Sequence, residues 1–254
     1  PSLHGVHLAL ALAQQLAGSS KPPRVVLLTC GAITFGGALS TAAHGGAWGF
    51  ARVVRLEHAA LHTQTADVSH GCALLMTPSH MLLAPTVEAE AAWTGGLHVV
   101  VTRLRACIGA SRANASLAGG AYAITGGLGG LGVRAATILV TSGVPRVLLA
   151  SRTGLVLRDG QGLETQLRSM GAAATLLVCD SASTRDTNAL CSASVLNGVL
   201  HAAGAGDKGL LVDLAGQRLQ WMHASKAMGA WHLQCAATAA LLEARVLFSS
   251  VSAG

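Results

Sequence analysis

The amino-acid sequence predicts an α/β fold, with a doubly wound parallel sheet in the second half of the chain. Two observations support this prediction. From residue 121 onward, apolar strand patterns alternate regularly with helical ones. The first of these strands runs into Gly126-Gly-Leu-Gly-Gly-Leu-Gly132, and a glycine-rich turn between a strand and a helix is the context in which a nucleotide phosphate binds.

The first hundred residues also alternate between helix and strand. We expect a helix over 4–17 that ends before Pro22-Pro23, a strand over 24–30, a helix over 42–62, a short strand ending at Asp67, a helical turn or two over 87–94, and a strand over 97–104. The glycines of 31–37 lack the phosphate-binding spacing. This half therefore resembles a degenerate Rossmann-like fold without a nucleotide site.

Residues 105–120, rich in Ala, Ser, Gly and Asn, form the expected boundary. It divides the chain into a structural subdomain, 1–112, and a Rossmann-like subdomain, 113–254. For the second subdomain we expect strands at 121–125, 146–151, 174–179, 197–202 and 245–250, and helices at 130–142, 161–170, 184–193 and 216–240. Ligands of such a sheet bind at the carboxyl ends of the strands.

Composition excludes several classes of function. The net charge of +6 comes from dispersed residues, mostly arginine, and aromatic residues make up only 3%. No basic stripe with stacking aromatic side chains is present, so nucleic acid is not an expected partner. Hydrophobic residues make up 51% and charged residues 11%, which predicts a weakly charged surface. Such a surface either contacts neighbouring domains or is simply the surface of an alanine-rich protein.

The sequence predicts a soluble chain in a reducing compartment. No apolar run is long enough to span a membrane. The six cysteines stand far apart, with no C-x-x-C pair, and we interpret them as buried thiols of a cytoplasmic protein. Because the first residue is Pro1, we take the sequence as a piece of a longer chain, whose targeting it does not define.

Ser151-Arg152 lies about twenty residues past the last glycine of the turn, directly after an apolar strand. A dinucleotide-binding unit places there the side chain that reads the adenosine ribose. An acid would repel a 2′-phosphate, whereas the guanidinium of Arg152 offers it a fork of donors. The sequence thus favours NADP over NAD, and the alternative is a solvated arginine at a strand end.

Two further strand ends carry candidate cofactor-binding residues. Asp180, followed by Ser181, can accept a hydrogen bond from an adenine amino group, or can act as an acid at a helix N-terminus. His201-Ala-Ala-Gly204 follows the fourth strand of this half. Its small residues let a cofactor lie against the backbone, unless the segment is only a tight turn.

Six ordered motifs resemble the ketoreductase domain of modular polyketide synthases, within the short-chain dehydrogenase/reductase superfamily. They are Thr125-Gly-Gly-Leu-Gly-Gly-Leu-Gly132, Leu149-Ala-Ser-Arg152, Cys179-Asp180, His201-Ala-Ala-Gly204, Lys226-Ala-Met-Gly-Ala-Trp231 and Leu247-Phe-Ser-Ser250. Residues 47–58 are similar to a helix of that family's structural subdomain. Animal-type fatty acid synthases are the nearest confusable relatives.

The resemblance implies a catalytic set of Ser, Tyr, Lys and Asn around a ketone. Ser250 matches the catalytic Ser, and Ser249 is the alternative. Lys226 matches the catalytic Lys, and the alternative is that it is only a solvated lysine on a helix. The Tyr and Asn are expected beyond residue 254, so we expect the fragment alone to be inactive. NADPH is the implied cofactor, and its expected contacts are Thr125, Gly126, Gly127, Leu128, Gly129, Gly130, Leu131, Gly132, Ser151, Arg152, Asp180, Ser181, His201, Ala202, Ala203 and Gly204.

Some features depart from the family or carry no prediction. Ala205-Gly-Asp-Lys208 replaces a Leu-Asp-Asp pattern that marks one stereochemical class, so the product configuration stays open. Tyr122 is expected in the core. His58 and His62 lack the Glu of a H-E-x-x-H motif, and no metal site is predicted.

Three functions remain after these observations. The first is NADPH-dependent reduction of a β-ketoacyl thioester that is tethered to an acyl carrier protein within a synthase. The second is a non-catalytic structural domain of the same ancestry, or the corresponding domain of a type I fatty acid synthase. The third is a free-standing dehydrogenase of small alcohols, which the N-terminal degenerate fold disfavours.

Overall fold

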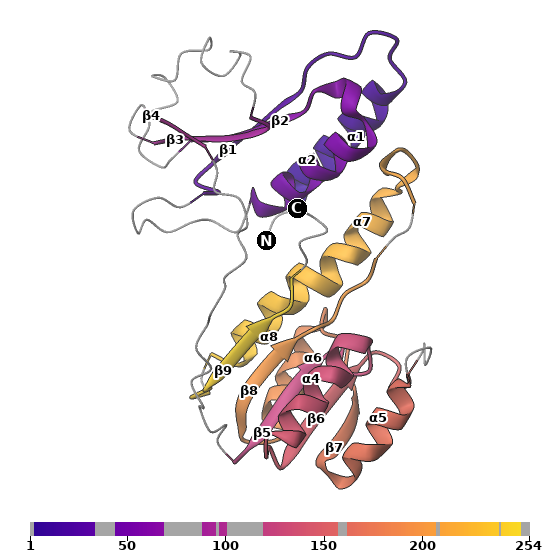
Figure 1. The fold of residues 1–254 in the computed structure, drawn as a ribbon, viewed down its shortest axis with the longest axis vertical. Helices are drawn as coiled ribbons and strands as arrows, with labels where there is room; N and C mark the ends of the chain where they lie inside the picture. The colour runs from indigo at the N-terminus through magenta and orange to yellow at the C-terminus, as the bar shows by residue number, and fades with distance from the viewer. Residues whose placement is uncertain are drawn as a thin grey trace. The chain divides into compact units, whose positions relative to one another are not determined.

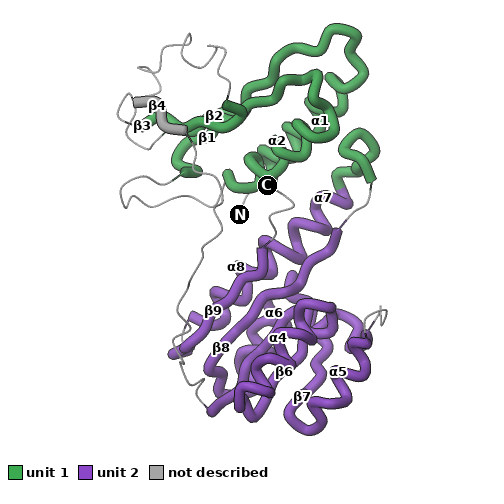
Figure 2. The backbone as a smooth tube through the Cα atoms, viewed as in Figure 1, with its two compact units in different colours: residues 1–110, 208–216, 250–254 green, residues 111–207, 217–249 purple. Residues whose placement is uncertain are grey.

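The computed structural model describes residues 3–33, 44–68, 88–94, 97–100, 119–156, 162–206, 209–238 and 240–249. The chain forms two compact units, which Figure 2 shows in different colours. The first unit comprises residues 1–110, 208–216 and 250–254, and the second comprises residues 111–207 and 217–249. The predicted α/β class is confirmed in both.

The first unit contains a four-stranded sheet of order β1-β2-β3-β4 (Figure 1). β1 and β2 are parallel, β2 and β3 are parallel, and β3 and β4 form an antiparallel pair. The elements are α1 (His4–Ala17), β1 (Val26–Cys30), α2 (Gly45–Glu57), a 3₁₀ turn (Ala59–Leu61), β2 (Gln64–Val68), β3 (Glu90–Thr94) and β4 (Leu97–Val100).

The helical turn expected over 87–94 is wrong, because Glu90–Thr94 forms strand β3. Its alanines favour a helix locally, but tertiary contacts decide otherwise. Ala91, Ala92 and Trp93 are buried, and Glu90 forms an ion pair with two arginines of α2: it accepts from Arg52 at 2.7 and 2.9 Å and also pairs with Arg55. The charge pairing holds the start of β3 to the helix.

Asp67, near the end of β2, is 1% exposed and binds the turn that follows β1. Its carboxylate accepts from the backbone N–H groups of Ala32 at 2.9 Å and Ile33 at 3.0 Å. The hydroxyl of Thr29 donates to it at 2.6 Å and accepts from the indole N–H of Trp48 at 2.9 Å. The protein's own carboxylate thus takes the N–H groups that a phosphate-binding turn would offer to a ligand.

The second unit contains a five-stranded parallel sheet of order β7-β6-β5-β8-β9 (Figure 1). In order of sequence this is 3-2-1-4-5, the order of a Rossmann-like fold. The elements are β5 (Ala121–Thr125), α4 (Gly130–Thr141), β6 (Arg146–Ser151), α5 (Leu163–Met170), β7 (Ala174–Val178), α6 (Thr184–Ser192), β8 (Leu196–His201), α7 (Gly216–His223), a π-helical turn (Ala224–Met228), α8 (Gly229–Ala236) and β9 (Ala244–Leu247).

Helices cover both faces of this sheet, as a doubly wound fold requires. Tyr122 and Ile124 of β5 pack with residues of α4 and α5, including Val133. Ala121 and Ala123, which point to the opposite face, pack in a separate cluster with residues of α6 and α8. Alternate side chains of β5 therefore fill two cores, which explains why its sequence is apolar throughout.

Tyr122 lies in the core, as expected, with no exposed surface. A Cβ at Gly198 on the neighbouring strand β8 would come within 2.3 Å of its ring. Glycine at that position therefore makes room for the tyrosine. Burial raises the pKa of Tyr122, with the charge of Glu243 acting in the same direction.

Residues 209–216 belong to the first unit, although they lie far along the chain. The side-chain amide of Gln14 on α1 donates to the carbonyls of Leu211 at 2.9 Å and Leu214 at 3.0 Å. The backbone N–H of Leu211 donates to Glu57 of α2 at 2.6 Å. This return was not predicted, because the segment itself looks in sequence like an ordinary loop before a helix.

None of the four described cysteines forms a disulfide, but the expectation that all are buried is wrong. Cys179 is buried, Cys30 and Cys191 are half-buried, and Cys235 is exposed on α8. Burial, together with the nearby carboxylates of Asp186 and Asp180, raises the pKa of Cys179 to about 11. Cys72 and Cys107 lie outside the described residues.

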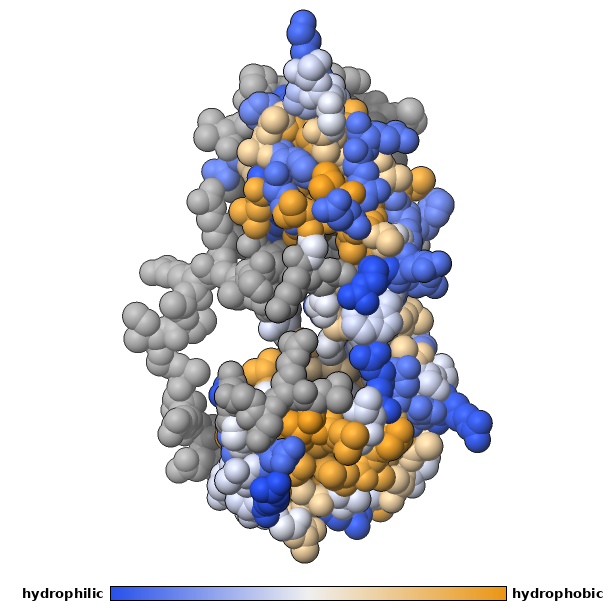
Figure 3. Space-filling view, turned by 90° about the vertical axis from the view of Figure 1, so that its right-hand side faces the viewer, coloured by the Kyte–Doolittle hydropathy of each residue, from blue (hydrophilic) through white to orange (hydrophobic). Residues whose placement is uncertain are grey.

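The surface of the second unit carries exposed apolar side chains (Figure 3). Leu176 and Val178 of β7, at one edge of the sheet, are 44% and 74% exposed, and Leu155 is 67% exposed. Within the described ranges, no helix is both long and apolar enough to cross a bilayer.

Candidate active site

The glycine-rich turn joins β5 to α4 at the carboxyl edge of the sheet. Thr125 ends the strand, and Gly126 has a φ of +69°, in the left-handed region that favours glycine. A Cβ on Gly126 would lie 2.6 Å from the backbone of Ala203, and one on Gly132 would lie 2.4 Å from the carbonyl oxygen of Gly126. These glycines let the turn pack tightly against the start of its helix and the loop after β8.

The N-terminus of α4 is open to a ligand. Its N-cap residue, Gly129, has no side chain to cap the helix, so the first N–H groups of α4 lack the usual internal partner. A Cβ at Gly129 would meet only the carbonyl oxygen of Gly126, at 3.3 Å. The tight packing of the other glycines and the free helix end fit a bound pyrophosphate.

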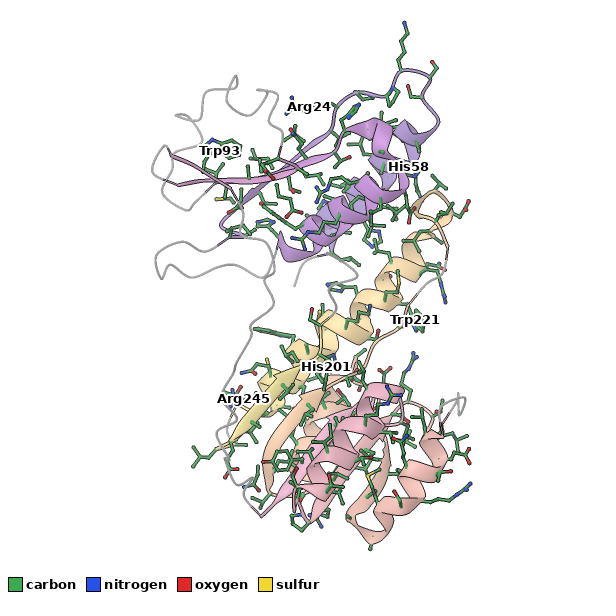
Figure 4. All side chains as sticks on the ribbon, in the orientation of Figure 1. Arg24, His58, Trp93, His201, Trp221 and Arg245 are labelled. Carbon is green, nitrogen blue, oxygen red and sulfur yellow. The ribbon has the colours of Figure 1, made fainter. Side chains whose placement is uncertain are left out.

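Arg152 follows β6, the strand next to β5, and is exposed. Its guanidinium lies 5.2 Å from the ring centroid of Trp221, and that of Arg218 lies 4.7 Å from the same centroid. Both arginines therefore make cation–π contacts with one indole of α7 (Figure 4 labels Trp221). The contact holds Arg152 at the strand end, where the prediction of a 2′-phosphate contact places it. The hydroxyl of Ser151 accepts from Gly154 N–H at 3.0 Å.

Asp180 lies in the turn between β7 and α6 and is half-buried. Its carboxylate accepts from the N–H of Ala182 at 3.0 Å. The N-cap of α6 is Ser183, which accepts from Asp186 N–H at 3.2 Å, so Asp180 does not cap the helix. Its predicted contact with adenine stays a prediction. The hydroxyl of Ser181 is buried and points toward the helix of Lys226, where it donates to Ser225 at 3.5 Å.

His201 ends β8 and is 4% exposed (Figure 4). Its Nδ1 lies 2.7 Å from the hydroxyl of Thr125, and its Nε2 lies 3.0 Å from the carbonyl oxygen of Lys226. Burial lowers the pKa of His201, although its backbone hydrogen bonds act in the opposite direction. The ring thus joins the strand before the glycine turn to the helix that carries the lysine.

The loop of Ala202–Gly204 lies beside the turn, because Ala202 N–H donates to Thr125 O at 2.9 Å. Lys226 is exposed, and its side chain runs along this loop. A Cβ at Gly204 would lie 3.2 Å from Cε of Lys226. The structure therefore brings together the glycine turn, the loop after β8 and Lys226 at the carboxyl edge of β5 and β8.

The second predicted catalytic residue, Ser250, lies outside the described residues, as does Asp207. The alternative serine, Ser249, is exposed after β9. The Thr125–His201 contact, the π-helical turn at Lys226, and the stacking of Trp221 and Arg218 were not predicted. The one sequence signal for the Thr125–His201 contact was a histidine at a strand end next to small residues.

Together the fold and the site define a reductase-type nucleotide-binding unit with the arrangement of short-chain dehydrogenases and reductases. The sequence profile of the KR domain matches residues 120–254, more than half of the chain. The chain belongs to this family of ketoreductase domains. The family membership predicted from the six motifs is confirmed.

Curated relatives are polyketide synthases. The chain is 38% identical over 137 residues to polyketide synthase GfsB of Streptomyces halstedii, which covers 52% of the chain and 2% of that protein. It is 32% identical over 195 residues to the PKS-NRPS hybrid synthetase acdB of Aspergillus candidus, which covers 73% of the chain and 8% of that protein. The chain thus spans a small part of each relative.

Solved structures of ketoreductases have the same fold. The first ketoreductase of the tylosin PKS superposes with a TM-score of 0.81 at 30% identity, over 99% of this chain and 56% of that one. A structure of an A1-type ketoreductase superposes with a TM-score of 0.79 at 27% identity, over 96% of this chain and 53% of that one. Ketoreductases of this kind are nucleotide-dependent reductases.

Proposed function

We propose that this chain, once extended through the expected Tyr and Asn, reduces a β-ketoacyl thioester, carried on an acyl carrier protein, to the β-hydroxyacyl form with NADPH. The observation that carries the proposal is the convergence of the open helix end after the glycine turn and Lys226 on one edge of the sheet. The first can hold a pyrophosphate. The second brings a cation to the place where a ketone would become negatively charged.

Each predicted site residue has a distinct part in the proposal. The N–H groups at the start of α4 bind the pyrophosphate, and Arg152 binds the 2′-phosphate, to which its planar guanidinium is suited. Bound NADPH supplies the hydride. Ser250 donates a hydrogen bond to the substrate carbonyl oxygen. Lys226 lowers the pKa of a tyrosine expected beyond residue 254, which then protonates the oxygen.

The proposed partners follow from the relatives and the surface. Since the matched relatives are large polyketide synthases, we place the chain beside other domains of such a synthase in the cytoplasm, with an acyl carrier protein delivering the substrate. The exposed apolar side chains at β7, including Val178, suit a surface that meets another domain.

The test of the activity is NADPH oxidation in the presence of a ketone such as decalone or a β-ketoacyl thioester. It is run on the 254-residue chain and on a chain extended through the expected Tyr and Asn. We expect turnover only in the extended chain, because general-acid assistance is worth about 10²- to 10⁴-fold. No turnover by the extended chain, under conditions where it is folded and binds NADPH, would contradict the proposed reaction.

The test of cofactor choice is calorimetric titration of NADPH and NADH into the Arg152→Ala variant. We expect NADPH affinity to fall about 10- to 100-fold with little change for NADH, because a hydrogen bond to a charged group contributes about 1.5–3 kcal/mol. Arg146→Ala is the matched control, since Arg146 begins the same strand at its opposite end. Equal affinities for both cofactors in the unmodified chain would refute the preference.

A further inference from the structure

The helix that carries Lys226 widens into a π-helical turn around that residue. α7 ends at His223, the turn covers Ala224–Met228, and α8 begins at Gly229. Lys226 is the central residue of the turn. A π-helical turn replaces regular i to i−4 hydrogen bonds with i to i−5 bonds, as from the N–H of Gly229 to the carbonyl of Ala224. Such turns in α-helices frequently occur at functional sites.

The additional donor at Lys226 is a side chain from the sheet. Nε2 of His201 lies 3.0 Å from the carbonyl oxygen of Lys226, which also accepts from the N–H of Gly229. The helix sequence from Ala224 to Gly229 contains no proline that would force the distortion. The histidine therefore stabilises the turn from outside the helix, at the carbonyl of the lysine itself.

The hydrogen-bond partners of His201 define its tautomer. A carbonyl oxygen only accepts, so the proton is assigned to Nε2. In the neutral ring Nδ1 then accepts from the hydroxyl of Thr125, 2.7 Å away. Both ring nitrogens form hydrogen bonds, and the side chain is only 4% exposed. The ring therefore has one orientation in which both hydrogen bonds are made.

The contact leaves little freedom for the helix to shift. A Cβ at Gly229 would lie 2.9 Å from Cε1 of His201 and 2.7 Å from Oγ of Ser181. On the other side of the turn, the hydroxyl of Ser225 accepts from Ala205 N–H at 3.1 Å. The turn around Lys226 is thus bound at the lysine carbonyl by His201, at the end of β8, and through the Ser225 hydroxyl by the loop after β8. A change at His201 therefore acts directly on the lysine backbone.

We propose that His201 is a positioning residue, which fixes the π-helical turn and thereby the place of Lys226 relative to the glycine turn after Thr125. Thr125 orients the imidazole, and the imidazole holds the carbonyl of Lys226. One ring therefore aligns the cofactor-binding turn with the lysine. This inference rests on the proposed function, in which Lys226 assists the proton transfer.

The experiment observes Lys226 directly by nuclear magnetic resonance, with its amine carrying ¹³C-methyl groups. The chain has only three lysines, Lys21, Lys208 and Lys226, and Lys226→Arg identifies the signal. The variants are His201→Ala, Thr125→Val and Thr125→Ser. The matched control is Thr187→Ala, which removes another buried hydroxyl that donates within α6 of the same unit, at 3.0 Å to Ser183 O and Thr184 O.

We expect His201→Ala and Thr125→Val to move the chemical shift of the Lys226 signal away from its position in the unmodified chain. Thr125→Ser keeps the hydroxyl and restores the chemical shift. Thr187→Ala lowers the melting temperature without moving the signal, and the other two lysine signals stay in place. This pattern distinguishes positioning of Lys226 from a general loss of stability.

A folded His201→Ala variant whose Lys226 signal matches that of the unmodified chain would overturn the inference. If that variant does not fold, Thr125→Val serves as the test, because it keeps the volume of the side chain and removes only the hydrogen bond that orients the ring. An unchanged Lys226 signal in Thr125→Val would then overturn the inference. The measurement needs no cofactor. An extended chain that is folded but fails to bind NADPH or to reduce a ketone would refute the proposed function and leave this result standing.

Discussion

The glycines of the turn after β5 divide into two groups by what surrounds them. A Cβ at Gly126 would lie 2.6 Å from the backbone of Ala203, and the residue has positive φ. Gly129 has φ −86° and ψ 167°, and a Cβ there would have one neighbour, at 3.3 Å. The first glycine is therefore required by the fold. The second leaves a surface that a ligand can approach.

A pair of variants tests this division. Gly129→Val keeps an allowed backbone, so we expect a native circular dichroism spectrum, but its side chain covers the helix N-terminus and NADPH binding is lost. Gly126→Val forces a branched side chain into the left-handed region and against the backbone, so we expect a folding defect. Normal NADPH binding by a native Gly129→Val variant would mean that the turn is not a phosphate site.

Residue-level prediction from sequence is possible where one position carries the signal, and it fails where two distant positions combine. Arg152 could be selected because its place after a strand and a glycine turn has a known chemical meaning. Its contact with Trp221 joins residues from separate elements, and no local pattern reports it. The same holds for the bond between Thr125 and His201.

At the scale of elements, β3 shows how a charge cluster outweighs local propensity. Burial alone would raise the pKa of Glu90, but hydrogen bonds and the charges of Arg52 and Arg55 outweigh it and lower the pKa below its usual value. The hydrogen bond to Glu90 raises the pKa of Arg52 in turn. The strand is thus tied to α2 by a carboxylate that is more stable ionised in the folded chain than in the unfolded one.

The pH dependence of stability follows from this direction. A depressed pKa contributes stability that is fully present above the unfolded value for Glu, about 4.3, and is lost as the pH falls through the lower folded value. We expect Glu90→Gln to destabilise the first unit at pH 7 and to flatten its loss of stability in acid. Urea titrations at several pH values measure this. If the variant lost unfolding free energy in acid as steeply as the unmodified chain does, Glu90 would be excluded as the source of that loss.

Asp67 has a comparable effect on the turn after β1. Its carboxylate accepts two backbone N–H groups and a hydroxyl, without a basic side chain among these partners. Because a carboxylate that satisfies these donors also blocks them, the described part of this turn, up to Ile33, offers these N–H groups to Asp67 and not to a phosphate.

Asp67→Asn tests the energetic part of this account. The amide nitrogen cannot accept, so one donor is left unsatisfied, at a cost of about 1–3 kcal/mol. We expect the unfolding midpoint of the first unit to fall, while NADPH binding by the second unit is retained. Asp213→Asn, at an exposed acid of the same unit, is the control and should have little effect. Equal stabilities of the two variants would contradict the role of Asp67.

At the scale of the whole molecule, prediction from sequence was best for the second unit. The strand over 121–125 has the predicted bounds, and the strands and helices up to β8 lie within two residues of theirs, because each is a regular apolar pattern punctuated by glycine or polar turns. The long helix predicted over 216–240 contains a π-helical turn and ends at Ala236. In the first unit, only α1 was predicted with its observed bounds.

The division into two subdomains at residue 112 stays a prediction. The two compact units differ from it in that each is built from separate segments of the chain. The first unit includes residues 208–216, which follow the first four strands of the second unit in sequence. Leu211 is 7% exposed and its N–H donates to Glu57. The first unit is therefore complete only after most of the second has been synthesised, which a reading of local patterns does not reveal.

Glu57→Ala tests whether this return segment depends on its contact with α2. The variant removes the acceptor of the Leu211 N–H, so we expect faster hydrogen exchange in the peptide that covers 209–216, measured by mass spectrometry, with unchanged exchange in β5 and β8. Glu164→Ala is the control, since Glu164 forms an exposed ion pair with Arg168 on α5 at 2.8 Å. Because Gln14 also binds the segment through two carbonyls, Gln14→Ala should add to the effect of Glu57→Ala in the double variant. Exchange at 209–216 that is equally slow in all of these chains would show that the segment is held by its apolar contacts alone.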